Sequence, residues 1–172
     1  MKAAVLCPGP SLPKEFDRTG YDHVIAVNRA ALSTDADYII LPDDYTLGWL
    51  TANALRRRPV IVSSLHKYRQ MIDSLWIALH SPFLERDIHW LEVPGYQWWT
   101  KSLTTALVLA AWMGADEIEC VGVDWKGTKD FDGFTDSSQQ RTDERWTKER
   151  LMARAVVAKL AEQGVTVKGL PK

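Results

Sequence analysis

Small and polar residues follow several short apolar segments of this chain, and their types suit binding of a phosphate-bearing ligand. Glycine lets the backbone approach a ligand closely, and a serine after it can cap a helix whose first amides point at a phosphate. Asparagine offers a donor and an acceptor to a ribose or base edge, and arginine pairs with phosphate. The candidate residues of this kind are Gly9, Pro10, Ser11, Asn28, Arg29, Asp43, Asp44 and Asp124.

Most of these residues also have a purely structural interpretation. Residues 9–11 match neither a G-x-G-x-x-G fingerprint nor a Walker P-loop, so a plain turn is as well supported as an anion site. Asn28 and Arg29 equally fit a turn asparagine and a solvated arginine. Asp43 and Asp44 point to opposite sides of an extended strand, so one ligand-facing or metal-facing acid is favoured over an acid/base pair.

Acidic residues in the second half of the chain bear on metal binding and catalysis. Asp124 follows an apolar strand, which favours a role in a site over a turn or cap. Asp130 and Asp132 form the D-x-D pattern of many metal-dependent glycosyltransferases, and Asp136 lies nearby. Such patterns arise often by chance in polar loops, so we assign no metal ligands here. The sequence identifies no nucleophile, since it contains no G-x-S-x-G elbow.

Strands alternate with helical segments, which predicts an α/β fold: a single Rossmann-like domain over residues 1–172, with a mainly parallel sheet and helices on both faces. The predicted strands are residues 2–6, 23–27, 38–41, 60–62, 117–121 and, at an edge, 165–167, with an extended piece at 88–91. The predicted helices are residues 45–57, 68–79, 102–113, with Ser102 as N-cap, and 143–163. The polar residues 126–141 are predicted to form a lid or a disordered loop.

Composition excludes several classes of protein. With 172 residues and a net charge of −1, the chain has room for one sizeable core and no general attraction to nucleic acid or anionic membranes. The longest uncharged apolar stretch, residues 102–115, is too short to span a bilayer, and no secretory signal is present. Cys7 and Cys120 are expected to be free, buried and reduced. We therefore expect a cytoplasmic protein.

Four motifs together resemble those of bacterial lipooligosaccharide sialyltransferases and of a related family that includes a 6-hydroxymethylpterin diphosphokinase. They are a Gly-Pro-Ser-Leu loop at residues 9–12, Asn28 after the second strand, Ser102 opening a small-residue helix, and a strand ending in Gly-x-Asp-aromatic at residues 122–125. The resemblance covers most of the chain in outline and is specific at these four places.

The resemblance implies a role for each matching position. Gly9, Pro10 and Ser11 would surround the nucleotide phosphates. Asn28 would contact the nucleotide or the transferred sugar, and Ser102 would touch the donor. The remaining implied ligand contacts are one of Asp43 and Asp44, and Asp124 at the nucleoside end.

The chain departs from the sialyltransferase pattern at three places. Leu103 stands where that family has glycine, and Trp99 stands where it has arginine. The family's catalytic histidine before the last helix is missing, because no histidine follows His89. An acid would have to replace it as the general base. The candidates are Asp143, Glu144 and Glu149, and Asp124 is a further catalytic candidate.

Three functions follow from these observations. The leading one is a nucleotide- or nucleotide-sugar-binding transferase of the glycosyltransferase kind. The second is a diphosphokinase acting on a small hydroxymethyl compound, with Mg²⁺ held by Asp43, Asp44 or Asp124. The third is a non-catalytic, phage-derived binding or assembly protein, in which Trp98 and Trp99 form a partner surface. A homo-oligomer is compatible with all three.

Overall fold

The computed structural model of the protein describes residues 1–41, 60–62, 78–79, 101–135 and 141–172. Within these ranges the strands form one sheet, and every hydrogen-bonded pair of neighbours runs parallel. The strands are β1 (Lys2–Leu6), β2 (His23–Val27), β3 (Tyr38–Ile40), β4 (Val60–Val62), β5 (Ala78–Leu79), β6 (Glu117–Val121) and β7 (Thr166–Lys168). The predicted α/β class with a mainly parallel sheet is therefore confirmed.

The strand order is β5-β4-β3-β2-β1-β6-β7, so the order reverses at β1. The chain moves outward from β1 through β2 to β5, then returns to add β6 and β7 on the other side. Leu6 at the end of β1 lies opposite Ala26 of β2 and Val121 of β6. The carboxyl ends of these three strands therefore meet at one edge of the sheet, where open α/β sheets form a ligand crevice.

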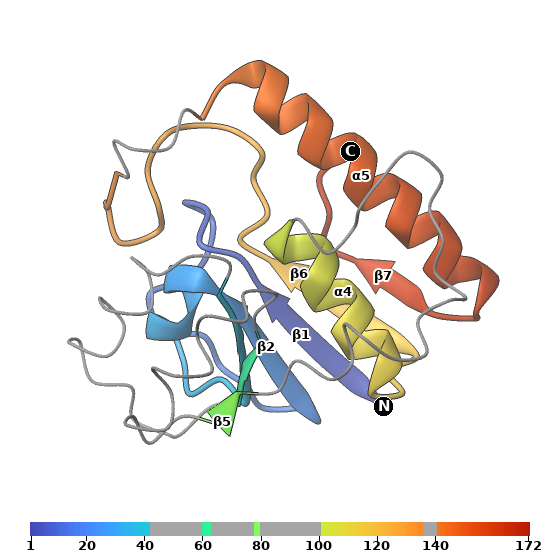
Figure 1. The fold of residues 1–172 in the computed structure, drawn as a ribbon. Coiled ribbons are helices and arrows are strands. Elements are labelled where there is room, and N and C mark those ends of the chain that lie inside the picture. The colour runs from blue at the N-terminus through green and yellow to red at the C-terminus, as the bar shows by residue number, and fades with distance from the viewer. Residues whose placement is uncertain (42–59, 63–77, 80–100, 136–140) are drawn as a thin grey trace.

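The two described α-helices cover one face of this sheet (Figure 1). Helix α4 (Ser102–Trp112) carries small and apolar side chains on nearly every side, and seven consecutive residues from Thr104 to Ala110 are buried. Helix α5 (Asp143–Glu162) is charged except for a stripe that buries Ala153, Val156 and Leu160. The spacing of three and four residues in this stripe matches one helix face, so α5 packs over α4 and the sheet.

The other face is covered by different means. Alternate strand residues, such as Ala4, Leu6 and Ile39, point to this side and pack against the 3₁₀-helix η1 (Asn28–Leu32) and Leu12. Helices on both faces remain a prediction, since both described α-helices lie on the first face. Within the described ranges, no helix is both long and apolar enough to cross a membrane.

The element boundaries follow the sequence prediction closely in the described regions. Strands 2–6, 23–27, 60–62 and 117–121 are confirmed; β3 ends one residue early, and the last strand is shifted by one residue and lies at the edge. The predicted helix 68–79 is wrong at its end, because Ala78–Leu79 form β5. The predicted helix 45–57 and the extended piece 88–91 lie outside the described residues.

Candidate functional site

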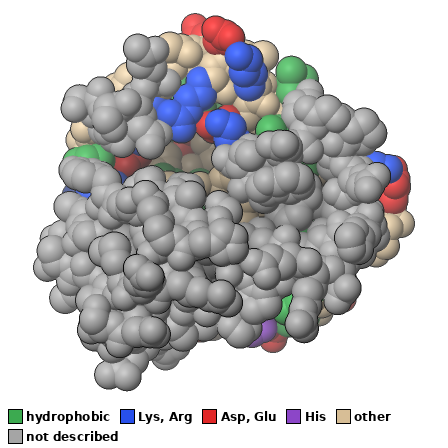
Figure 2. Space-filling model, viewed as in Figure 1, with side chains coloured by type: hydrophobic (Ala, Val, Ile, Leu, Met, Phe, Trp, Pro, Cys, Tyr) green, Lys and Arg blue, Asp and Glu red, His purple; other side chains and the backbone are tan. Residues whose placement is uncertain are grey.

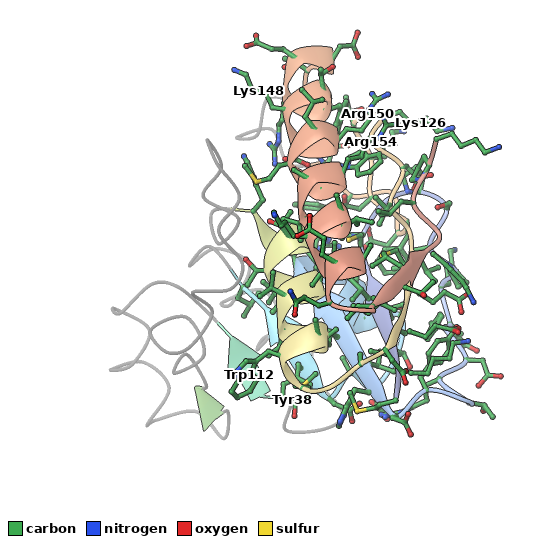
Figure 3. The ribbon with its side chains drawn as sticks, turned by 90° about the vertical axis from the view of Figure 1, so that its right-hand side faces the viewer. Tyr38, Trp112, Lys126, Lys148, Arg150 and Arg154 are labelled. Atoms are coloured by element: carbon green, nitrogen blue, oxygen red, sulfur yellow. The ribbon has the colours of Figure 1, made fainter. Side chains whose placement is uncertain are left out.

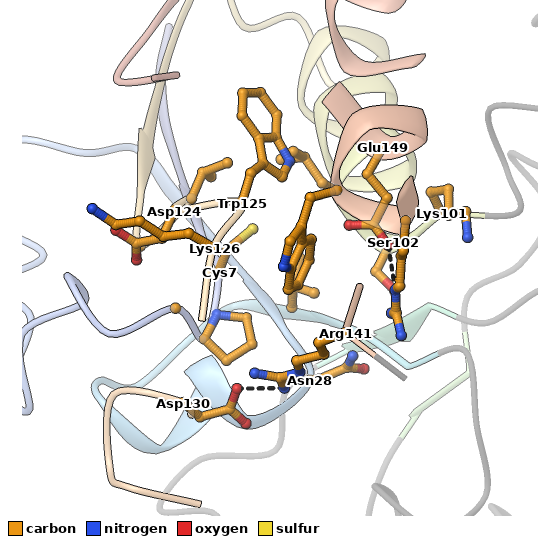
Figure 4. Close-up of a pocket in the computed structure, with 18 of the residues that line it drawn as sticks. Cys7, Asn28, Lys101, Ser102, Asp124, Trp125, Lys126, Asp130, Arg141 and Glu149 are labelled. Atoms are coloured by element: carbon orange, nitrogen blue, oxygen red, sulfur yellow. Dashed lines mark hydrogen bonds and ion pairs between the residues drawn. The ribbon is translucent and has the colours of Figure 1, made fainter. Parts of the chain in front are cut away.

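A cavity of about 340 Å³ opens at the carboxyl ends of β1, β2 and β6 (Figure 4). Its walls are the loops that follow these strands, and the first turns of α4 and α5 close it from above the sheet. The lining residues named below are Cys7, Gly9, Pro10, Asn28, Lys101, Ser102, Gly122, Asp124, Trp125, Lys126, Asp130, Arg141, Arg145, Trp146 and Glu149. The cavity thus brings together most of the ligand contacts predicted within the described ranges.

The loops after β1 and β6 touch at Gly9. The Gly9 N–H donates to the Gly122 carbonyl at 3.0 Å. A Cβ at position 9 would overlap this carbonyl and the carboxylate of Asp124. Glycine is needed at this position because another part of the protein lies against it. The close approach that the sequence suggested for a ligand is made here by the loop after β6.

Ser11 does not have the predicted helix-capping role. No helix follows it in residues 12–22, and it lies outside the cavity lining. Its backbone N–H and its hydroxyl both donate to Oδ2 of Asp124, at 3.0 and 2.9 Å. The amide expected to receive a phosphate therefore already binds a carboxylate of the protein. Asp124 in turn lines the cavity with one oxygen committed to Ser11.

Asn28 directly follows β2 as the first residue of η1 and has a left-handed backbone conformation, with φ of 50°. Its Oδ1 is buried and accepts no hydrogen bond from any residue that the structure describes. The other described non-glycine residue with positive φ is Trp125, at 47°, in the loop after β6. Both residues line the cavity. Unusual backbone conformations and unsatisfied polar atoms gather where structure is shaped for binding, so both observations point to the same place.

Arg29 is neither solvated nor directed into the cavity. It is buried at 8 % exposure, and its guanidinium pairs with Asp132 and lies 3.6 Å from Oδ2 of Asp130. The ring of Phe134 lies 4.0 Å below the guanidinium. The interpretation of Arg29 as a solvated side chain is therefore wrong, whereas its role as a phosphate ligand stays a prediction. Arg29 instead anchors the loop after β6 to the end of β2.

Asp130 and Asp132, the acids of the D-x-D pattern, form the ion pairs of this same contact. The side chain of Asp130 is 3 % exposed and accepts a hydrogen bond from Nη2 of Arg141 at 2.6 Å. Burial raises the pKa of Asp130, and the charges of Arg141 and Arg29 oppose that effect. The part of residues 126–141 that the structure describes is thus held by buried ion pairs. Among the described residues, no cluster of three His, Cys, Asp or Glu side chains could hold a metal ion.

Basic side chains surround the opening of the cavity. Figure 2 shows lysine and arginine side chains gathered around a hollow on the upper part of the molecule. Lys101 precedes α4, Lys126 follows β6, and Arg141 and Arg145 flank the start of α5. The Arg145 Nε donates to Glu149 at 2.9 Å. Positive charge at a helix N-terminus opposes the helix dipole, so arginines at this position suggest a role other than stabilising the helix. The sequence analysis did not identify Arg141 and Arg145 as candidate site residues.

The predicted catalytic acids separate into two groups. Asp143 and Glu144 are exposed and lie outside the cavity lining, and Glu144 pairs with Lys148 at 2.7 Å. Glu149 and Asp124 line the cavity. Of the three acids named as replacements for the missing histidine, Glu149 is therefore the one placed to reach a ligand.

The remaining candidate residues are placed as follows. Ser102 lines the cavity as the first residue of α4, but the N-cap is Lys101, so the predicted capping role is wrong. The hydroxyls of Thr104 and Thr105 both donate to the Lys101 carbonyl. Four residues with predicted roles lie outside the described ranges, together with Asp136: Asp43, Asp44, Trp98 and Trp99.

The two cysteines are buried and free, as predicted. Burial raises the pKa of Cys7 well above its usual value and raises the pKa of Cys120 to about 12. Cys7 lines the cavity, yet its thiol stays protonated at neutral pH. Because the thiolate is the nucleophilic form of cysteine, Cys7 acts here as an apolar wall residue.

Comparisons of the chain with protein-family models, with curated proteins and with solved structures find no match.

Proposed function

We propose that the cavity binds a nucleotide or nucleotide sugar, and that the protein is a Rossmann-like transferase of the glycosyltransferase kind. The observation that carries this proposal is the unsatisfied, buried Oδ1 of Asn28 in a cavity whose rim is basic. A nucleotide sugar supplies what these groups lack, since it offers hydroxyl and amino donors and phosphate oxygens.

The size and position of the cavity support the same ligand class. Its volume of about 340 Å³ is at the lower end of the roughly 300–1,000 Å³ typical of small-molecule sites. That suits a single nucleotide with the acceptor entering from outside. The cavity also lies at the reversal of strand order, where nucleotides bind in open α/β sheets.

Glu149 is the proposed general base for glycosyl transfer. In this step the acceptor hydroxyl oxygen bonds to the anomeric carbon of the sugar, and Glu149 takes the hydroxyl proton. The bond from the anomeric carbon to the phosphate oxygen breaks, and the nucleotide leaves with the electron pair. Arg141 and Arg145, which line the cavity, are the residues proposed to stabilise the negative charge that develops on the leaving phosphate. Ser102, at the N-terminus of α4, is proposed to offer the donor its hydroxyl and its backbone N–H.

The first test is a thermal-shift panel of CMP, CDP, UDP, GDP, ADP and ATP, each with and without Mg²⁺. A ligand at about 100 times its Kd stabilises the native protein by about 2.7 kcal/mol, which raises Tm by several degrees. We expect a metal-independent shift with one nucleotide, strongly reduced in Asn28→Ala. The matched control is Lys148→Gln, which changes an exposed lysine outside the cavity.

The other two functions are distinguished by the same panel. A shift with ATP that requires Mg²⁺ would replace glycosyl transfer by the diphosphokinase reaction, whose proposed metal ligands Asp43 and Asp44 lie outside the described residues. A shift that is the same in wild type and Asn28→Ala would show that the ligand binds elsewhere. No shift with any nucleotide would favour the non-catalytic binding or assembly role.

A further inference from the structure

Three basic side chains lie together on one side of α5, next to the cavity (Figure 3). Arg150 and Arg154 are four residues apart and so share a face of the helix. The guanidinium of Arg150 lies 6.0 Å from the ring centre of Trp125, and Lys126 is the next residue in the chain. Lys126, Arg150 and Arg154 are called the basic patch below.

No described acid lies within ion-pairing distance of the basic patch. No ion pair joins Lys126, Arg150 or Arg154 to a described acid, although most acids of α5 are paired. Those pairs are Glu144 with Lys148, Glu149 with Arg145, and Glu162 with Lys159. Like charges on one helix face repel each other, so three cations left together without an acid are unfavourable in the free protein.

Arg150 shows that the patch is more than a solvated surface. Its Nε is buried and makes no hydrogen bond among the described residues. A buried donor without a partner costs free energy, and such groups in native structures need an explanation. The ring beneath it belongs to Trp125, whose φ of 47° is costly for a large side chain. The strained backbone of Trp125 therefore accompanies a partly desolvated guanidinium, which binds anions more strongly than one in bulk water.

The patch is continuous with the cavity, because Trp125 and Lys126 also line the cavity. Figure 4 shows Lys126 and Lys101 on opposite sides of the cavity. Lys101, Arg141 and Arg145 line the cavity, where the phosphate of a donor is proposed to bind, whereas Arg150 and Arg154 lie outside its lining.

We propose that the basic patch binds an anionic group, a phosphate or a carboxylate, of the acceptor substrate. The assignment to an acceptor rests on the proposed transferase function. The patch comprises three cations on a chain with a net charge of −1, which suits one small anionic group better than a long polyanion. The acceptor would then present its hydroxyl to the cavity while its anionic group is held beside Trp125.

The test uses inorganic pyrophosphate as probe and isothermal titration calorimetry as readout, with and without a saturating nucleotide in the cavity. Loss of a charge-assisted contact is worth about tenfold or more in Kd. We expect Arg150→Gln/Arg154→Gln to weaken pyrophosphate binding by at least that factor while nucleotide affinity is unchanged. Lys148→Gln, on the same helix, is the control and should bind pyrophosphate as wild type does. Arg154→Gln alone, at an exposed position outside the cavity lining, provides the same test if the double variant does not fold.

Several outcomes would overturn the proposal. These are pyrophosphate binding that is unchanged in the patch variants, and pyrophosphate binding that disappears once the nucleotide is bound. Single-stranded DNA that binds the patch far more tightly than pyrophosphate, with a steep salt dependence, would identify a nucleic-acid surface instead. Patch-dependent pyrophosphate binding in a protein that binds no nucleotide would support the anion site and overturn the transferase function.

Discussion

Ser11 donates two hydrogen bonds to a single carboxylate oxygen of Asp124, one from its backbone N–H at 3.0 Å and one from its hydroxyl at 2.9 Å. The two residues are 113 positions apart, and they join the loop after β1 to the loop after β6. These strands are neighbours at the reversal of strand order. The contact therefore fixes one wall of the cavity before any ligand binds.

A double-mutant cycle on Ser11 and Asp124 measures this contact. Ser11→Ala removes the hydroxyl bond and should lower the free energy of unfolding by about 1 kcal/mol. Asp124→Ala removes both bonds and should cost about 2 kcal/mol, because the Ser11 amide loses its partner as well. Since the two residues share an interaction, the double variant should cost less than the sum of the single variants. If the costs measured by urea unfolding are strictly additive, the hydrogen bond between the Ser11 hydroxyl and Asp124 contributes nothing to stability.

The contact at Gly9 predicts a specific steric effect. An alanine Cβ at this position overlaps the Gly122 carbonyl and the Asp124 carboxylate, so one loop must shift. Gly9→Ala should therefore destabilise the protein by about 2 kcal/mol, as overpacking typically does. Gly127→Ala is the informative comparison, because a Cβ there meets nothing within 4 Å and only its φ of 74° is unfavourable. Gly127→Ala should lower the free energy of unfolding by about 1 kcal/mol and leave nucleotide binding intact. Gly9→Ala should lower both the stability of the protein and its affinity for the nucleotide. A Gly9→Ala protein as stable as wild type would contradict the packing of these loops.

The sequence predicted the parallel strands because each is a short apolar run that ends at polar or turn-forming residues. The site residues Asn28 and Asp124 were found by the same signal, since they follow two of these runs. The helix over residues 102–113 was also predicted correctly, but its cap was not. Ser102 has the right side chain for an N-cap, whereas the N-cap position belongs to Lys101, which makes no side-chain capping hydrogen bond.

Long-range pairing was beyond what the sequence alone indicates. Arg29 and Asp132 are 103 positions apart. No local sequence pattern shows that an arginine just after β2 will be buried against a distant polar loop. The same loop has the composition of a lid, but ion pairs to Arg29 and Arg141 hold its described part. The basic patch was missed for a related reason. Arg150 and Arg154 look like an ordinary solvated face until Trp125 and Lys126 are placed beside them.

The buried pair of Asp130 and Arg141 gives a pH-dependent prediction. Arg141→Gln removes one of the charges that oppose the effect of burial on the Asp130 carboxyl, so the folded-state pKa of Asp130 should rise further. A carboxyl whose pKa is raised on folding destabilises the folded state when it is ionised, and protonation relieves that cost. The variant should therefore lose about 2 kcal/mol at neutral pH, and less as the pH falls through the raised pKa.

Urea unfolding of wild type and Arg141→Gln between about pH 7 and about pH 4 measures this difference directly. Carboxylates elsewhere are the same in both proteins, so their contribution cancels in the comparison. Lys148→Gln removes an exposed ion pair with Glu144 and should leave stability nearly unchanged at either pH. A cost of Arg141→Gln that is constant with pH, or that grows on acidification, would contradict the arrangement around Asp130.

The two cysteines give a final prediction about the packing between the sheet and α4. Both thiols are buried, and burial raises the pKa of both, so both stay protonated at neutral pH. A thiol reagent such as 5,5′-dithiobis(2-nitrobenzoate) should therefore react very slowly with the native protein and rapidly with both thiols in denaturant. Single variants, Cys7→Ser and Cys120→Ser, assign any native reaction to one site. Because Cys7 lines the cavity, a bound nucleotide should slow its reaction further while that of Cys120 changes less. Fast labelling of Cys120 in the native protein would mean that the core between β6 and α4 opens readily, which is incompatible with its full burial.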